Sequence, residues 1–339
     1  MLHCLGYMKI FTRTGFGDSK RSFGGVDMHV PFCGLGQGSK AAPASWVQLS
    51  SVIVNCFKTK GFGAIIRDPI TGTVSHSIGC LFVDDTDLYA MEEGRLDSAV
   101  AIHQEAQNGL NWWSSLLAAT GGAIRGDKSF WYLLSYSCSN GIWNYNDIPY
   151  TLTLSVPDGP DVSLLSEKPT HAVKTLGVLT APCGGHAAQL AAIRERTDKW
   201  IQKMKNGHLP ASHVWTSYLH QLRPGLQYGL GTLSNDMESS YSCLAGTEFQ
   251  ILPLLGVNHN IKRGWRTLHQ TFGGIGLIDL TVEQFISRIN LFQQHYGTPT
   301  ALGHKLSASI HWLQLQIGST ISPFQMSYPK YAHLAPKLG

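Results

Sequence analysis

The feature of the sequence that most restricts its fold is the stretch CLFVDDTDL at residues 80–88. Apolar residues on both sides of two adjacent aspartates predict two short strands, at 77–83 and 86–91, joined by a tight hairpin turn at Asp84 and Asp85. Aspartate is common in turns because its side chain accepts hydrogen bonds from nearby amides, so the pair needs no function. Two adjacent carboxylates also repel each other unless a cation lies between them, which favours a divalent-metal site. The pair alone leaves both interpretations open.

Composition places the chain among globular proteins. Hydrophobic residues make up 43% and charged residues 14% of the 339 residues, a balance that excludes a disordered chain. The stretch 47–57 is too short and too polar to span a bilayer, and the N-terminus lacks the apolar centre of a signal peptide. Seven scattered cysteines without a CxxC pair argue against a disulfide framework and against a zinc finger. We therefore expect an intracellular protein, nuclear or cytoplasmic, that does not bind membranes.

The second half of the chain is the more basic one. Residues 1–150 contain 11 Lys and Arg against 12 Asp and Glu, whereas residues 151–339 contain 15 against 10. Apolar residues at helical spacing predict helices over 44–57, 96–119 and 189–205. The last of these should bury its apolar face and expose most of its cations. Such a basic helix is either a solvated surface or a contact for a polyanion.

Two glycine-rich stretches are near matches to nucleotide-binding loops. CGLGQGSK at 33–40 lacks the glycine spacing of the dinucleotide fingerprint, and the next acid, Asp68, lies too far along the chain. GGAIRGDKS at 121–129 has Asp127 at the position where a P-loop has its lysine, and a carboxylate there opposes phosphate binding. A P-loop hydrolase that binds triphosphate through Lys128 remains the weaker alternative.

Four stretches taken in order are more informative than any of them alone. GLGQGSKAAPASW (34–46), Phe-Val-Asp-Asp (82–85), GGAIRGDKSFWYL (121–133) and KTLGV (174–178) follow one another along the chain. This order and spacing resembles motifs B, C, D and E of reverse transcriptases, most closely those of non-long-terminal-repeat retrotransposons and related elements.

The resemblance implies an α+β fold. Residues 1–183 would form an incomplete polymerase palm, an antiparallel sheet with helices on one face. Residues 184–339 would form a mostly helical thumb and connection region. The implied activity is that of an RNA-directed DNA polymerase, a two-metal nucleotidyl transfer with Mg²⁺ as cofactor. The implied partners are an RNA template and a DNA primer, or an RNA–DNA hybrid.

The resemblance also assigns roles to individual residues. Asp84 would be the main Mg²⁺ ligand and Asp85 its supporting partner, and Lys128 would neutralise the leaving pyrophosphate unless it is an ordinary solvated lysine. Contact with the incoming nucleotide and the template would come from Gly36, Gln37, Gly38 and Phe82. A primer grip would be formed by Leu176 and Gly177. Contact with the nucleic-acid backbone would come from Arg194, Arg196, Lys199, Lys203 and Lys205.

One departure from the family concerns its motif A, an upstream Phe-x-x-Asp strand that provides a further metal ligand. The residues before Gln37 contain only Asp18 and Asp27, and neither lies in an apolar strand. The fingers are missing as well. We therefore expect an N-terminally truncated polymerase with little or no activity by itself. The alternative is a non-catalytic nucleic-acid-binding or interaction protein derived from a retroelement.

Overall fold

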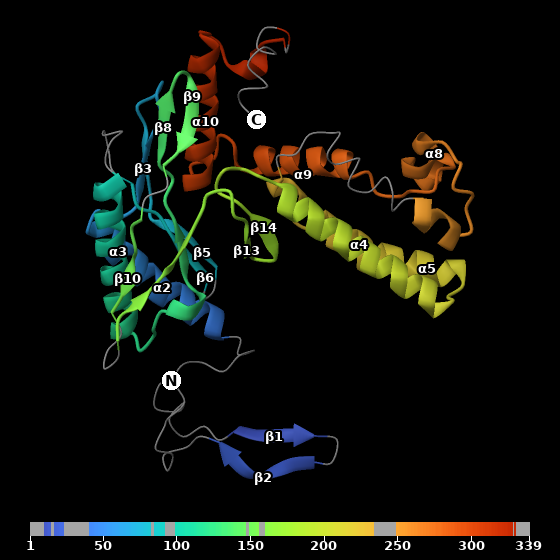
Figure 1. Cartoon of the computed structure of the whole chain (residues 1–339), viewed down its shortest axis with the longest axis horizontal. Coiled ribbons are helices and arrows are strands. Elements are labelled where there is room, and N and C mark those ends of the chain that lie inside the picture. Colours follow the sequence, from blue (N-terminus) through green and yellow to red (C-terminus); the bar gives the residue numbers. More distant parts are fainter. Residues whose placement is uncertain are drawn as a thin grey trace. The chain divides into compact units, whose positions relative to one another are not determined.

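The computed structural model shows a mixed α/β chain (Figure 1) and describes residues 10–14, 17–23, 41–82, 85–91, 99–146, 149–155, 160–233, 249–327 and 329. The chain divides into two compact units that are interleaved along the sequence. The first unit consists of Met1–Ala64, His76–Ser129 and Tyr150–Leu164, and the second unit consists of Ile65–Ser75, Phe130–Pro149 and Leu165–Gly339.

The described strands pair as two-stranded sheets. Most of these sheets are antiparallel hairpins, and β12 pairs with β7 in parallel. The broad prediction of an α+β chain therefore agrees with the structure. The finer prediction, a palm over residues 1–183 followed by a thumb over 184–339, remains a prediction.

The first unit is built around two helices that follow glycine-rich or polar stretches. Its elements are β1 (Ile10–Thr14), β2 (Gly17–Phe23), α2 (Ala41–Thr59), β5 (Gly79–Phe82), β6 (Asp85–Leu88), α3 (Ala99–Ala119), the 3-10 helix η1 (Gly126–Lys128), β10 (Thr153–Leu154) and β11 (Val162–Ser163). The helices predicted over 44–57 and 96–119 are confirmed as α2 and α3. Gly61 ends the turn after α2 with a φ of +91°, a conformation that favours glycine at helix C-termini.

The core of the first unit is aromatic. Phe57 of α2 stacks on Phe62, with ring centroids 4.8 Å apart, and meets the edge of Trp113 of α3 at 5.4 Å. Ile53 and Ile78 complete the buried cluster. Ile78 immediately precedes β5, so this core anchors the hairpin that contains the paired aspartates.

The second unit is mainly helical. Its helices are α4 (Ala187–Gly207), α5 (Ala211–Ser217), the π-helix η2 (Tyr218–Leu222), α6 (Arg223–Gln227), η3 (Leu230–Thr232), residues 249–254, α8 (Arg263–Thr267), η4 (Gln270–Phe272), α9 (Leu280–His295), α10 (Ala301–Ile317) and η5 (Pro323–Gln325). Its strands are β7 (Phe130–Tyr132), β8 (Tyr136–Ser139), β9 (Ile142–Tyr145), β12 (Leu165–Glu167), β13 (Val173–Thr175) and β14 (Val178–Thr180). Two further strands, β3 (Ala64–Arg67) and β4 (Val74–Ser77), pair with each other, and the residues between them belong to this unit.

Helix α4 confirms the helix predicted over 189–205, and its apolar face is buried as predicted. Ile193, Trp200 and Ile201 are buried in the core of the second unit, and Leu190 and Met204 pack against that core. Each fully buried aliphatic side chain contributes about 1.5–3 kcal/mol, so this face fixes the rotation of α4. The predicted cations of the helix are all exposed.

Candidate nucleic-acid interface

The hairpin predicted at the paired aspartates is present in the first unit. β5 and β6 pair in antiparallel fashion, with Phe82 opposite Asp85 and Cys80 opposite Asp87. Asp85 is therefore the first residue of β6, and its prediction as a turn residue was wrong. The connection has the predicted length of two residues, but the pairing of Phe82 with Asp85 places it one residue earlier in the chain. Asp84 lies outside the described residues.

Asp85 and Asp87 lie on the same face of β6, because side chains alternate along a strand. Both residues are exposed by surface area, yet partial loss of water raises the pKa of Asp87, and the charge of Asp85 raises it further. On the neighbouring strand, Cys80 Sγ lies 3.1 Å from the hydroxyl of Tyr89. Partial burial and this contact raise the pKa of Tyr89. Negative charge is thus disfavoured here, and a nearby cation would relieve it. Asp87 was not predicted as a site residue, although the alternation of side chains along a strand could have paired it with Asp85.

The donor set for Mg²⁺ is incomplete in the part of the chain that the structure describes. No group of three His, Cys, Asp or Glu side chains that could hold a metal is found there. Mg²⁺ often binds through one or two carboxylates together with waters and substrate phosphates. Asp85 and Asp87 could form such a partial set, but the predicted main ligand, Asp84, is not described. The Mg²⁺ prediction therefore remains a prediction.

The other residues predicted around the hairpin are only partly described. Phe82 is 59% exposed at the end of β5. The predicted nucleotide-binding and template-binding residues Gly36, Gln37 and Gly38 lie outside the described residues. Lys128 ends the short helix η1 and is exposed. Its neighbours Arg125 and Asp127 form a two-pronged ion pair at 2.9 and 2.7 Å, which lowers the pKa of Asp127.

The KTLGV stretch is a tight hairpin in the second unit. In β13 and β14, Thr175 pairs with Val178, so Leu176 and Gly177 form a two-residue connection. Both have positive φ, +50° and +88°, which is typical of the type I′ turn that best fits the twist of a hairpin. Leu176 is 44% exposed at the tip. The role of this tip as a primer grip remains a prediction.

Two side chains from neighbouring helices hold this hairpin. The buried Gln189 of α4 accepts a hydrogen bond from the amide of Leu179 at 2.8 Å. The hydroxyl of Tyr228, directly after α6, donates to the carbonyl of Leu176 at 2.5 Å. The hairpin and the first turn of α4 are therefore one local assembly. Gln189 and Tyr228 were not predicted as site residues, because neither belongs to a local motif.

The cations of α4 do not form a single stripe. At about 100° per residue, Arg194 and Lys205 fall within about 20° of each other on one edge of the buried face. Arg196 and Lys203 fall within about 20° of each other on the opposite edge, and Lys199 lies about 40° from Lys203. One nucleic-acid duplex therefore cannot contact all five predicted cations at once. The edge with Arg196 lies on the side of Gln189 and the hairpin.

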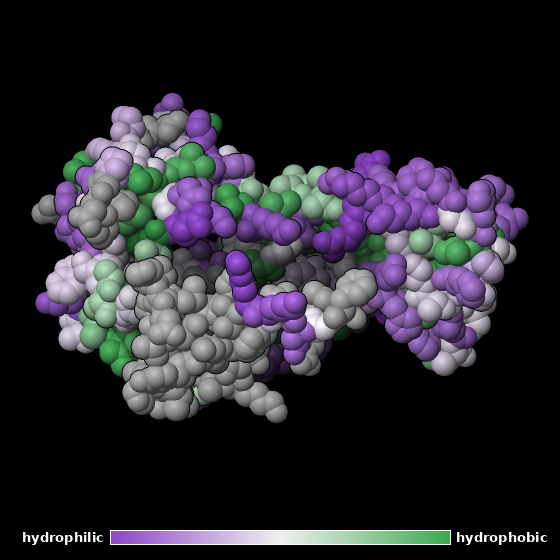
Figure 2. Space-filling model, turned by 90° about the horizontal axis from the view of Figure 1, so that it is seen from below, coloured by the Kyte–Doolittle hydropathy of each residue, from purple (hydrophilic) through white to green (hydrophobic). Residues whose placement is uncertain are grey.

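Several of these cations already have partners. Arg196 Nη1 donates to the carbonyl of Gly225 in α6 at 2.5 Å. Lys199 pairs with Glu195 at 2.5 Å, and Lys205 donates to Gln250 at 2.9 Å. The Lys199–Glu195 pair is about two-thirds exposed on both sides, so it contributes little and can open to meet a phosphate. Helices α5 and α8 lie at the right end of Figure 1 and of Figure 2. The surface at that end of Figure 2 is largely hydrophilic.

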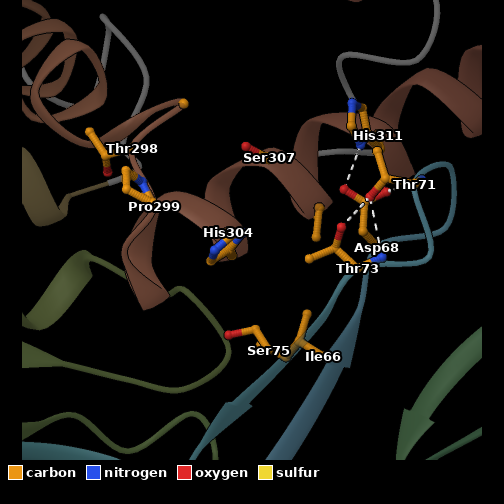
Figure 3. A pocket seen from close by; sticks show the side chains of 12 residues that line it. Ile66, Asp68, Thr71, Thr73, Ser75, Thr298, Pro299, His304, Ser307 and His311 are labelled. Carbon is orange, nitrogen blue, oxygen red and sulfur yellow. Dashed lines mark hydrogen bonds and ion pairs between the residues drawn. The ribbon is translucent and has the colours of Figure 1, made fainter.

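A cavity of about 330 Å³ in the second unit is a separate candidate site (Figure 3). It lies between the residues around the β3–β4 connection and α10. Asp68, at its wall, accepts hydrogen bonds from the amides of Ile70 and Thr71 at 2.9 Å and lies 2.6 Å from His311 Nδ1. Burial alone would raise the pKa of Asp68, but these hydrogen bonds lower it below its usual value. Both oxygens of its carboxylate have partners, so Asp68 fastens the connection to α10.

Comparisons with protein-family models, with curated proteins and with solved structures found no match. The resemblance to reverse transcriptases therefore rests on the sequence motifs alone and stays a prediction. Among the helices that the structure describes, none combines the length and apolar character needed to cross a membrane.

Proposed function

We propose that the chain is related to reverse transcriptases and that its second unit binds an RNA–DNA hybrid. The observation that carries this proposal is the local assembly of the β13–β14 hairpin with α4. An exposed apolar tip, Leu176, lies on a hairpin that is hydrogen-bonded to α4, and the nearer edge of α4 exposes Lys199 and Lys203. The tip can contact the end of a strand, and the lysines can contact its phosphates.

The dimensions of α4 agree with such a contact. Fourteen residues separate Gln189, beside the hairpin, from Lys203, which corresponds to about 21 Å of helix at 1.5 Å per residue. On double-stranded DNA, with about 3.4 Å per step, this length would correspond to about six steps. Lysine–phosphate contacts of this kind are independent of base sequence and weaken as salt is added.

The proposed function is binding without strand extension. In the family, Mg²⁺ held by carboxylates stabilises the charge on the attacking and leaving oxygens. Binding through lysine–phosphate contacts needs no such metal, so the chemistry of Mg²⁺ is no part of the activity that we propose.

Fluorescence anisotropy with a labelled RNA–DNA hybrid tests this proposal. We expect the logarithm of the binding constant to fall linearly with the logarithm of the salt concentration, with a slope of about −2 for two phosphate contacts. Absence of binding at 50 mM salt, or binding that does not depend on salt, would refute it.

A parallel assay separates the two candidate functions. Asp84→Ala/Asp85→Ala should leave hybrid binding unchanged if the chain is a non-catalytic nucleic-acid-binding protein. Loss of binding in this variant would indicate a retained metal-dependent site. Primer extension with Mg²⁺ by the unmodified chain, abolished by Asp84→Ala, would show a polymerase and contradict the proposal of binding without extension.

A further inference from the structure

The tip of the β13–β14 hairpin has an unusual residue at its first turn position. Leu176 has a φ of +50°, in the left-handed region that residues with a Cβ rarely adopt. Type I′ turns usually place Asn, Asp or Gly at this position. A strained backbone of this kind persists where the surrounding structure holds it in place, and it occurs often at binding sites.

Tyr228 provides that support. Its hydroxyl donates to the carbonyl of Leu176 at 2.5 Å. Its ring also covers the second turn residue, since a Cβ atom on Gly177 would lie only 3.2 Å from Tyr228 Cε1. One side chain therefore contacts both residues of the turn, while 55% of Tyr228 remains exposed.

The backbone that carries Tyr228 is fixed in turn. Gly229 has a φ of +84°, and a Cβ there would lie 2.7 Å from Val178 Cγ2, so this backbone packs directly on β14. Arg196 of α4 donates to the carbonyl of Gly225, three residues before Tyr228. The turn, Tyr228 and the cationic edge of α4 are thereby connected through direct contacts.

We propose that Tyr228 is a positioning residue, whose hydroxyl holds the Leu176–Gly177 tip in place to receive the recessed 3′ end of a strand in an RNA–DNA hybrid. This inference rests on the proposed function. The tip presents an exposed leucine and no charge, which suits the sugar and base of a terminal pair. The α4 lysines, which carry charge, suit the phosphates behind that pair. Tip and lysines should therefore contribute separately to binding.

Tyr228→Phe tests the inference, because it removes the hydroxyl and keeps the ring. The affinity of the full chain is measured for two hybrids of equal length, one with a recessed 3′ end and one blunt. We expect the unmodified chain to prefer the recessed end and Tyr228→Phe to weaken recessed-end binding roughly five-fold, the size of one hydrogen bond. Blunt-end binding should not change, whereas a purely structural role would move both affinities together.

Tyr136→Phe is the matched control, because Tyr136 is also an exposed tyrosine of the second unit and contacts the ring of Tyr145. It should change neither affinity. Hydrogen exchange adds a readout that needs no ligand: the amides of residues 176–178 should exchange faster in Tyr228→Phe than in the control.

The outcomes separate this inference from the proposed function. If the unmodified chain binds hybrid and Tyr228→Phe keeps the full preference for the recessed end, the positioning role is refuted and hybrid binding stands. If the unmodified chain binds no hybrid, the proposed function fails, and the role of Tyr228 toward a strand end fails with it. Unchanged exchange at 176–178 in Tyr228→Phe refutes the positioning of the tip in either case.

Discussion

Substitutions on the two edges of α4 should have different effects on the binding of an RNA–DNA hybrid. Lys199→Gln/Lys203→Gln removes two cations on the edge nearer the hairpin, and Arg194→Gln/Lys205→Gln removes two on the far edge. Arg196 is left in place because its guanidinium donates to the carbonyl of Gly225 and supports α6. Both double variants remove the same charge, so any difference between them reports the position of the bound duplex.

The expected magnitude follows from counterion release. Each phosphate contact contributes about 0.9 to the slope of log K against log salt, so Lys199→Gln/Lys203→Gln should reduce the slope by about 1.8. The far-edge variant should change the slope by less than about 0.5, because its cations are nearly opposite on the helix. Binding is measured by anisotropy from 50 to 200 mM salt.

The two double variants should be as stable as the unmodified chain, so that a difference in salt slope reports binding alone. All four side chains are exposed, and surface substitutions of this kind change the free energy of unfolding by less than about 0.5 kcal/mol. Thermal melts of both variants check that expectation. Equal reductions of the salt slope in the two variants, or a larger one in the far-edge variant, would refute the placement of the duplex on the hairpin side.

Three further predictions concern stability. Asp68→Ala should lower the free energy of unfolding by about 3 kcal/mol at pH 7, since two amides lose hydrogen bonds to a carboxylate at about 1.5 kcal/mol each; urea titration measures it. Because the pKa of Asp68 is lowered in the folded protein, this contribution should disappear as the pH falls below about 4, and a constant difference down to pH 2 would contradict it. Asp87→Asn should slightly stabilise the protein at pH 7, on the order of 0.5 kcal/mol, because its pKa is raised and its ionised form opposes folding. Differential calorimetry should show this gain vanish near pH 3, and a loss at pH 7 would contradict it. Gly79→Ala should lower the melting temperature strongly, because the new Cβ would lie 1.9 Å from the carbonyl oxygen of Asp87, whereas Gly264→Ala meets nothing within 4 Å and should not.

The sequence predicted the elements whose signals are local. Apolar periodicity located α2, α3 and α4 because each helix buries one continuous face, and the turn preference of aspartate located the β5–β6 hairpin. The prediction for Asp85 was wrong by one position, because the turn preference of aspartate placed the two-residue connection on the aspartate pair, whereas Phe82 pairs with Asp85. The division of the α4 cations between two edges could have been predicted from the sequence, since it follows from 3.6 residues per turn.

Other features depend on contacts that no local pattern contains. Asp68 and His311 lie far apart in the sequence, and their contact joins the β3–β4 connection to α10. Gln189 and Tyr228 act on the β13–β14 hairpin from separate helical segments. Such pairs arise from tertiary packing, so the motif KTLGV indicates the turn but not the side chains that hold it.

Photo-crosslinking shows which residues of the chain contact the end of a bound strand. An RNA–DNA hybrid with a photoreactive nucleotide at its recessed 3′ end is irradiated with the full chain, and the crosslinked peptide is identified by mass spectrometry. We predict crosslinks within residues 174–178, weakened by Lys199→Gln/Lys203→Gln and unaffected by Arg194→Gln/Lys205→Gln. A hybrid that binds but crosslinks only to α2 or α3 of the first unit would contradict the claim that the β13–β14 hairpin and α4 form the nucleic-acid interface.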